Sequence, residues 1–178
     1  TAVPNQFGIQ LTSASSFTNT GTIALAGDGI SLSSQGAFAN SGTITAAGNA
    51  LRLFGPRFSN SGMIRSTGAT AVDLSGSFGS DWSNSGTIAG ATTGLVFANS
   101  VFVNTGTISG TVTGVSLGSG GRLENRAGAV ISGGTAAIAP SFGISNASIT
   151  NAGIINGNVS LAGQFPSATS FGRYFAEV

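Results

Sequence analysis

Apolar and polar residues alternate at every second position in many short stretches of this chain, as they do in half-buried β-strands. The clearest stretch reads FANSGTIT at residues 38–45, and close copies stand elsewhere, such as WSNSGTIA at residues 82–89. Each copy has a large apolar residue, Asn two positions later, Gly two positions after Asn, and a second apolar residue two positions after Gly. The pattern predicts two short strands joined by a bend at Asn and Gly.

Seven copies of this motif follow one another at steps of 20 to 26 residues. Their Asn residues are Asn19, Asn40, Asn60, Asn84, Asn104, Asn125 and Asn151. The large apolar positions are Phe17, Phe38, Phe58, Trp82, Phe102, Leu123 and Ile149. The second apolar positions are Ile23, Ile44, Ile64, Ile88, Ile108, Val130 and Ile155, with the Gly of the sixth copy displaced to Gly128.

A second motif, of the form small–apolar–x–apolar, lies between the copies of the first. Its first apolar residues are Ile9, Ile30, Leu51, Val72, Leu95, Val115, Ile138 and Val159, at steps of 20 to 23 residues. Because two independent motifs share one period, the chain is built of repeats of about 21 residues. The leucine-rich spacing L-x-x-L-x-L is absent, and Gly recurs too often for a helix in each repeat.

These repeats predict an all-β fold: a single-stranded parallel β-helix (β-solenoid) of about seven to eight coils of roughly 21 residues, with two or three short strands in each coil. One domain is expected over residues 1–178, with a lead-in at 1–8, coils at 9–161 and a tail or cap at 162–178. Successive coils stack about 4.8 Å apart, so equivalent inward side chains such as Phe38 and Phe58 should lie on one another.

The bend between the two strands is expected to depend on both of its invariant residue types. In the second copy, Gly42 should tolerate positive φ, and Asn40 should hydrogen-bond its own backbone. Stacked Asn side chains are also expected to hydrogen-bond from coil to coil, as in the Asn ladders of cross-β assemblies.

The register also predicts two charge pairs on the outer surface. Arg52 falls one coil below Asp73, and Arg57 falls one coil below Asp81. Opposite charges on neighbouring strands stabilise a sheet by about 0.2–1 kcal/mol per pair.

The composition restricts the chemistry of the chain, because charged residues make up 6% and Cys, His and Lys are absent. A Ser-His-Asp triad, a thiol nucleophile and a typical zinc site are therefore excluded. The acidic residues are Asp28, Asp73, Asp81, Glu124 and Glu177, and no two of them share an outward column. We expect no catalytic, cofactor-binding or metal-binding residue and no enzymatic activity, the alternative being a carbohydrate-active β-helix enzyme that uses these carboxylates.

Nucleic-acid binding and a membrane-spanning helix are also not expected. A net charge of +1 offers no electrostatic footprint for nucleic acid. No apolar run approaches the roughly 20 residues of a transmembrane helix.

One outward position is rich in Thr, at Thr22, Thr43, Thr87 and Thr107. Such an array could form an ice-binding plane, but it is interrupted at Met63, Ala129 and Ile154. Thr is also a common residue of exposed strands, which we prefer as the explanation.

Phrases such as FANSGTIT and FVNTGTISG (residues 102–110) resemble the passenger regions of bacterial autotransporters and, more loosely, secreted β-solenoids of the filamentous-haemagglutinin type. The resemblance covers residues 7–161 and implies a right-handed β-helix, secreted or on the bacterial cell surface, that serves adhesion, aggregation or display. It supplies no catalytic residues. Since the chain begins at Thr1 and lacks the barrel of an autotransporter, we expect an excised passenger or a protein exported by another route.

Two functions are compatible with these observations. The first is a structural protein that stacks head to tail with copies of itself into a fibre or surface layer, because an uncapped solenoid end is a row of open backbone donors and acceptors. The second is an adhesin or display module that binds host or sister-cell ligands, carbohydrates included. Its variable loops would lie at residues 75–81 and 141–147.

Overall fold

The computed structural model of the protein describes residues 7–12, 16–33, 36–55, 57–77, 81–141 and 146–160. Within these residues the chain forms 21 β-strands and no helix, which confirms the predicted all-β fold. The described ranges accordingly contain no helix long and apolar enough to cross a membrane. The first strand begins at Phe7, within the expected lead-in, and the expected tail lies outside the described residues.

The strands form three parallel sheets of seven strands each, here called sheets A, B and C. Sheet A consists of β1 (Phe7–Leu11), β4 (Asp28–Leu32), β7 (Leu51–Leu53), β10 (Val72–Leu74), β13 (Thr93–Phe97), β16 (Thr113–Leu117) and β19 (Ala136–Pro140). Sheet B consists of β2 (Phe17–Asn19), β5 (Ala37–Asn40), β8 (Arg57–Asn60), β11 (Asp81–Asn84), β14 (Val101–Asn104), β17 (Arg122–Asn125) and β20 (Ser148–Asn151). Sheet C consists of β3 (Thr22–Leu25), β6 (Thr43–Ala46), β9 (Met63–Ser66), β12 (Thr87–Gly90), β15 (Thr107–Gly110), β18 (Val130–Gly133) and β21 (Ile154–Asn156).

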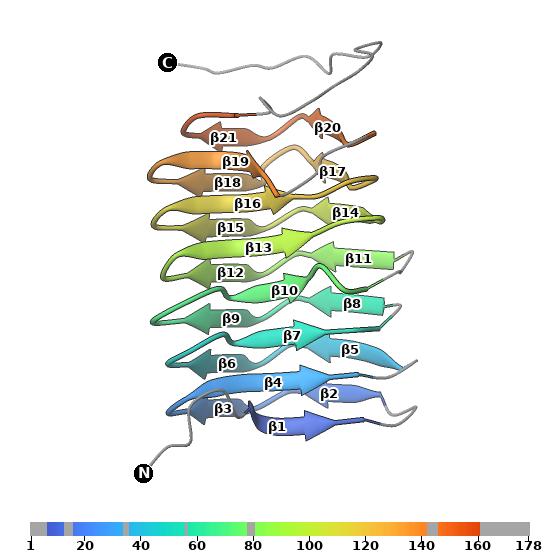
Figure 1. Ribbon diagram of the computed structural model, residues 1–178, viewed down its shortest axis with the longest axis vertical. Coiled ribbons are helices and arrows are strands. Elements are labelled where there is room, and N and C mark those ends of the chain that lie inside the picture. Colours follow the sequence, from blue (N-terminus) through green and yellow to red (C-terminus); the bar gives the residue numbers. More distant parts are fainter. Residues whose placement is uncertain are drawn as a thin grey trace.

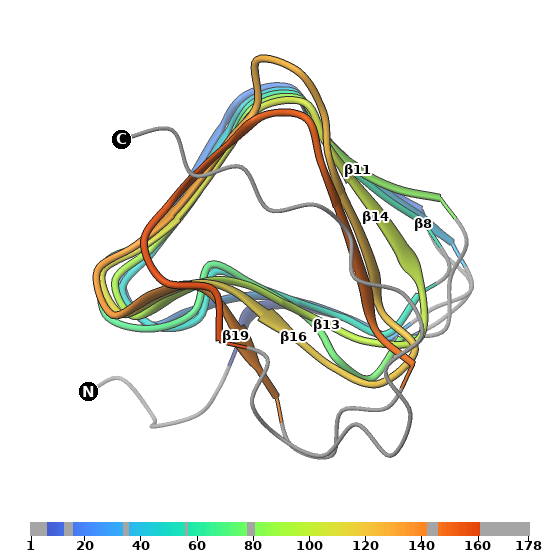
Figure 2. The same ribbon diagram turned by 90° about the horizontal axis from the view of Figure 1, so that it is seen from above.

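One strand from each sheet makes one coil, so the described residues form seven stacked coils, which is about six turns from the first coil to the last. Viewed along the axis, the sheets are the three sides of a triangle (Figure 2). As the chain climbs, the strands of sheet A run to the right at the front and those of sheets B and C return behind them (Figure 1). The β-helix is therefore right-handed, as expected.

The core is built from the inward side chains of all three sheets, and equivalent residues pair from coil to coil. The column of the second motif contains Ile9, Ile30, Leu51, Val72, Leu95, Val115, Ile138 and Val159, as predicted. In sheet C the column contains Ile23, Ile44, Ile64, Ile88 and Ile108. In sheet B it contains Phe17, Phe38, Phe58, Trp82 and Phe102. Alternation of buried and less buried residues, as in β5 and β6, explains the period of two in the sequence.

The prediction that Val130 points inward in the sixth coil is wrong. Ile131 takes the place in the Ile column and is fully buried, whereas Val130 lies on the outer side. The bend that precedes them is two residues longer than in the other coils and closes as a turn, with the N–H of Ala129 donating to the carbonyl of Arg126 at 3.0 Å. Gly128 lies in this turn at a φ of 81°. The longer bend moves the inward position from four to six residues after the Asn, which is one residue beyond the predicted Val130.

The aromatic column begins as a regular stack. The ring centroids of Phe17 and Phe38 are 5.5 Å apart, and those of Phe38 and Phe58 are 5.8 Å apart. Each pair has an interplanar angle of 7°.

Trp82 interrupts this stack. It lies in the coil between Phe58 and Phe102, yet those two rings approach to 6.0 Å and tilt by 32°. The indole instead meets Phe97 of sheet A edge to face, with centroids 6.3 Å apart and an interplanar angle of 78°. Its Nε1 is buried and has no hydrogen-bond partner among the described residues. The larger ring is thus accommodated by leaving the axis of the column.

Candidate functional site

The seven Asn residues of the first motif form an unbroken ladder of side-chain hydrogen bonds along the solenoid. Nδ2 of each Asn donates to Oδ1 of the next over 2.8–2.9 Å, through Asn19, Asn40, Asn60, Asn84, Asn104, Asn125 and Asn151. Five of them are at most 2% exposed, Asn40 through Asn125. Because a buried amide needs hydrogen-bond partners, the ladder satisfies groups that would otherwise destabilise the core.

Each amide is also fixed by the bend that carries it. Nδ2 of Asn40 donates to the carbonyl of Gly42 at 3.1 Å, and to the carbonyl of Met63 in the next coil at 3.2 Å. Every amide group in the ladder therefore points in the same direction, with nitrogen toward the C-terminal end and oxygen toward the N-terminal end. The ladder has a polarity.

The glycine of the motif has a different role from the one expected. Gly42 is not at positive φ, which among the described glycines occurs only at Gly120, Gly128 and Gly157. A Cβ on Gly42 would instead lie 2.0 Å from the carbonyl oxygen of Gly21 in the coil below. Gly62, Gly86, Gly106 and Gly153 are crowded in the same way, at 2.0–2.4 Å from backbone oxygens. The close approach of stacked bends, rather than backbone conformation, requires glycine here.

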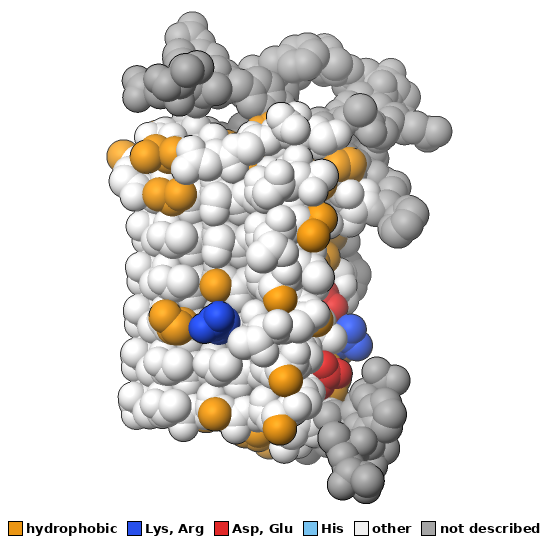
Figure 3. All heavy atoms as spheres, turned by 90° about the vertical axis from the view of Figure 1, so that its left-hand side faces the viewer, with side chains coloured by type: hydrophobic (Ala, Val, Ile, Leu, Met, Phe, Trp, Pro, Cys, Tyr) orange, Lys and Arg blue, Asp and Glu red, His pale blue; other side chains and the backbone are white. Residues whose placement is uncertain are grey.

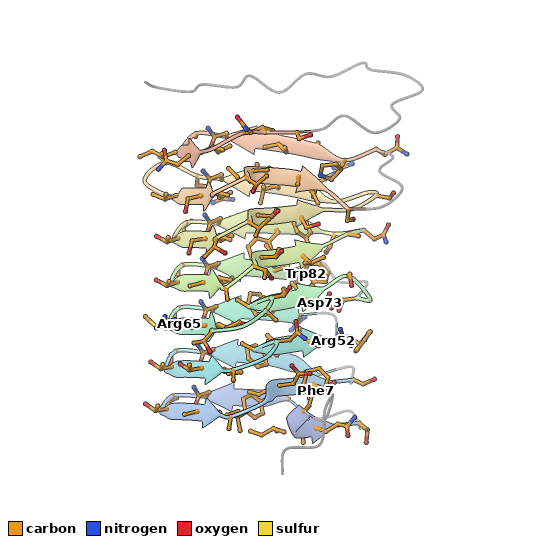
Figure 4. All side chains as sticks on the ribbon, turned by 60° about the vertical axis from the view of Figure 1, so that its left-hand side comes forward. Phe7, Arg52, Arg65, Asp73 and Trp82 are labelled. Carbon is orange, nitrogen blue, oxygen red and sulfur yellow. The ribbon has the colours of Figure 1, made fainter. Side chains whose placement is uncertain are left out.

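Arg52 and Asp73 form the expected ion pair, with Nε and Oδ2 3.2 Å apart and the two side chains 42% and 18% exposed. The guanidinium carbon of Arg52 also lies 5.7 Å from the ring centroid of Phe7, in the coils below (Figure 4). Arg57 and Asp81 are paired in the backbone register, while the side chain of Asp81 is outside the described part. The ion pair of Arg52 and Asp73 connects neighbouring coils on the outer surface, and the contact of Arg52 with Phe7 spans from the third coil to the first.

Three carboxylates are described, and each is engaged by a neighbour. Oδ1 of Asp28 accepts from the backbone N–H of Asn49 at 2.7 Å, and Oε2 of Glu124 lies 3.2 Å from Nη2 of Arg126. Asp28, Asp73 and Glu124 belong to β4, β10 and β17, so they lie in different coils. No group of three His, Cys, Asp or Glu residues within the described ranges is placed to hold a metal ion. Chemistry that needs adjacent carboxylates has no site among these three.

The Thr-rich column lies on the outer face of sheet C. Thr22, Thr43, Thr87 and Thr107 share it with Met63, Val130 and Ile154, so Val130 replaces the expected Ala129. Met63 and Ile154 are 41% and 52% exposed. The column is a mixed polar and apolar strip rather than a regular hydroxyl array.

The connections from sheet A to sheet B form the variable edge of the prism. They range from three residues (98–100) to seven (141–147), whereas the connections from sheet B to sheet C have two residues in all coils but one. Phe54, on this edge, is 43% exposed. The loops singled out at 75–81 and 141–147 belong to this edge, and residues 78–80 and 142–145 lie outside the described part.

The two end coils differ from the others in how far their core residues are covered. Ile30, Phe38 and Ile44 of the second coil are at most 1% exposed. Their equivalents in the first and last coils are only partly buried, namely Ile9, Leu11, Phe17, Ile23 and Leu25 at one end and Ile149, Ile155 and Val159 at the other. Among the described residues, the N-terminal end thus presents an apolar layer bordered by the open edges of all three sheets. The C-terminal end is bordered by the open edges of sheets B and C, while residues 158–160 lie on the edge of sheet A.

No family model, no curated protein and no solved structure matches this chain.

Proposed function

We propose that this chain is a non-catalytic structural β-solenoid, secreted or on a bacterial cell surface, which assembles end to end with copies of itself into a fibre or surface layer. The partly buried apolar residues of the two end coils carry this proposal. Buried equivalents of the same residues hold the middle coils together, so a second copy that stacks on an end would bury the same surface in the same way.

The lateral face over the turns from sheet C to sheet A offers less for association than the ends (Figure 3). The face over the turns from sheet C to sheet A carries few charged side chains, and its hydrophobic ones are scattered (Figure 3). Open strand edges, by contrast, supply unpaired N–H and C=O groups in fixed directions. A head-to-tail contact does not close on itself, and therefore produces a filament. The resemblance of the first motif to autotransporter passengers supports the extracellular location.

The proposal is tested by light scattering and electron microscopy of the purified chain over a dilution series. Particles of constant width are expected, which lengthen with concentration in steps of about 35 Å, the height of seven stacked coils at about 4.8 Å each. Particles that grow in width, or a monomer at every concentration, would contradict end-to-end assembly.

The variable edge supports a second candidate, an adhesin or display module. Its connections range from three to seven residues, while those from sheet B to sheet C have two residues in all coils but one and those from sheet C to sheet A have two to five. An edge with long connections of variable length is typical of a scaffold that presents binding loops. Replacing residues 75–80 and 141–147 by three-residue connections like 98–100 should abolish adhesion to cells and leave assembly unchanged. Adhesion that persists would refute this candidate.

A further inference from the structure

We infer that the assembly is polar, with the first coil of one copy (β1–β3) docked in register on the last coil of another (β19–β21). This inference rests on the proposed end-to-end assembly and specifies which ends meet and through which atoms. Three features of the end coils support it, each independent of the others.

The first feature is the chemistry at the two ends of the Asn ladder. Oδ1 of Asn19 accepts from the N–H of Gly21 in its own bend at 3.2 Å, and no coil of the described chain lies below to donate to it. Nδ2 of Asn151 donates to the carbonyl of Gly153 in its own bend at 3.1 Å, and within residues 7–160 as described no strand of sheet B or C lies above to accept from it. One end therefore presents an acceptor and the other a donor. Head-to-tail docking joins them, whereas like ends would bring two donors or two acceptors together.

The second feature is the empty space at Gly21. Gly42, Gly62, Gly86, Gly106 and Gly153 are each crowded by a backbone oxygen, whereas a Cβ on Gly21 would have no atom within 4 Å. Gly128 of the longer sixth bend is also uncrowded, but its φ of 81° favours glycine. Nothing in the described chain requires glycine at this position. In the docked arrangement Gly21 lies above the bend of Asn151 and Gly153 in the other copy, where glycine is required for the same reason as at Gly42.

The third feature is the match between the apolar layers. In-register docking places Phe17 on Ile149 and Ile23 on Ile155, which continues the columns of sheets B and C by one further coil. These are pairings of a large apolar residue with Ile and of Ile with Ile, which already occur within the chain as Leu123 with Ile149 and Ile23 with Ile44.

Residues 158–160 block part of the surface that this docking requires. Residues 158–160 lie on β19, with Val159 bridged to Ile138, and the N–H of Ser160 donates to the carbonyl of Ile138 at 2.9 Å. They occupy the edge of sheet A on which β1 of the docked copy would lie. The inference therefore includes the release of residues 158–160 from β19 when the second copy binds.

The glycine variant separates assembly from folding. Gly21→Ala should leave the monomer intact and raise the concentration needed for assembly about tenfold or more, because overpacking of a well-fitted contact costs that much. Thr22→Ala, the neighbouring outward residue, is the control and should assemble like the wild type.

The ladder is tested from the other end. Asn151→Asp keeps the oxygen that accepts from Asn125 but removes the terminal donor and its bond to the carbonyl of Gly153. The variant should still fold, at a cost of about 1 kcal/mol for the lost bond, and raise the assembly concentration about tenfold to hundredfold. Ser148→Asp adds the same charge to the outer face of the same strand, beside Arg122, and should have no such effect.

Because the chain has no Cys, an engineered disulfide that holds residues 158–160 on β19 can test their release. The bridge between Ile138 and Val159 places Ser160 beside Ala139, and neighbouring strands are close enough for a disulfide. The Ala139→Cys, Ser160→Cys double variant should assemble when reduced and remain monomeric when oxidised.

The outcomes distinguish the two levels of the proposal. A wild-type chain that never associates would overturn both the assembly and its polarity. Filaments that form equally well with Gly21→Ala and Asn151→Asp would overturn the polar docking and leave end-to-end assembly standing. An oxidised double variant that still assembles, or a Cys pair that does not oxidise, would overturn the release of residues 158–160.

Discussion

Gly62→Ala tests the physical reason for the glycine column. The added Cβ would lie 2.0 Å from the carbonyl oxygen of Gly42 and 2.6 Å from the carbonyl carbon of Ser41, both backbone atoms of the coil below. Gly62 is not at positive φ, so alanine can adopt its backbone conformation. The whole effect of the substitution must therefore come from the stacked neighbour.

The magnitude follows from the movement that the methyl group forces. The two bends have to separate by about 1 Å before the contact reaches the shortest distance that real Cβ atoms tolerate. This separation weakens the bond from the N–H of Met63 to Gly42 at 2.9 Å and the bond from Asn40 to Asn60 at 2.8 Å. Each bond contributes about 1 kcal/mol net, and overpacking adds about 1–3 kcal/mol. We expect a loss of about 3 kcal/mol in the free energy of unfolding.

Gly21→Ala is the matched control, because the same residue type in the same bend has no atom within 4 Å of the added Cβ. Its effect should be neutral or stabilising by about 0.4–1 kcal/mol, since alanine reduces the entropy of the unfolded chain. Urea unfolding followed by circular dichroism, at a concentration at which the chain is monomeric, measures both variants. Equal destabilisation would refute the reasoning and return the requirement for glycine to the bend itself.

Three single substitutions and one double-mutant cycle test the other columns and the surface. Asn60→Asp should lower the free energy of unfolding by about 3 kcal/mol at pH 7, because it buries a charge and removes the amide donor. The loss should be smaller at pH 3, because the protonated carboxyl can donate a hydrogen bond. Urea unfolding at both pH values measures the difference. Phe58→Ala should cost about 3–5 kcal/mol in a urea titration, and Phe54→Ala, at a ring 43% exposed, less than about 1 kcal/mol. A double-mutant cycle on Arg52 and Asp73 should give a coupling of about 0.5 kcal/mol that shrinks in 1 M salt; a larger coupling that persists in salt would contradict a surface pair.

The columns of the core could be predicted from the sequence because a repeat reports its own register. Once the copies of each motif are aligned, each residue of a motif is assigned a neighbour in the next coil. The pairing of Phe38 with Phe58 then follows from the first motif and that of Arg52 with Asp73 from the second, without any structural knowledge. Local alternation then decides which of these positions point inward.

Where a repeat changes length, its spacing no longer shows which residue lies next to which in the following coil. In the sixth coil Val130 and Ile131 are adjacent apolar residues, and only the path of the longer bend decides which of them is buried. Trp82 aligns with the Phe column, yet its size directs it against Phe97, a contact between two sheets that no repeat spacing encodes.

The structural features on which the proposed function rests are the ones that the sequence predicts least well. Gly21 and Gly62 occupy the same position of the same motif, but one has free space below it and the other a backbone oxygen at 2.0 Å. The seven Asn residues could be expected to form a ladder. Its direction, however, depends on which amide atom bonds to the bend, as Nδ2 of Asn40 does to the carbonyl of Gly42. The space beside each glycine and the direction of the ladder both depend on neighbours in three dimensions, so identical residues in the sequence do not reveal them.

The architecture itself explains why function should concentrate at the ends. A middle coil buries its inward residues against two neighbours, so Leu51 or Ile64 is fully covered, while an end coil has one neighbour and keeps part of its apolar layer open. Adding coils lengthens the stable middle and leaves the cost of the two ends unchanged. A solenoid can remove that cost only by covering its ends, and identical repeats make a second copy the best-matched cover available. In the proposed assembly the one-way Asn ladder would decide which ends meet, because only donor against acceptor continues it.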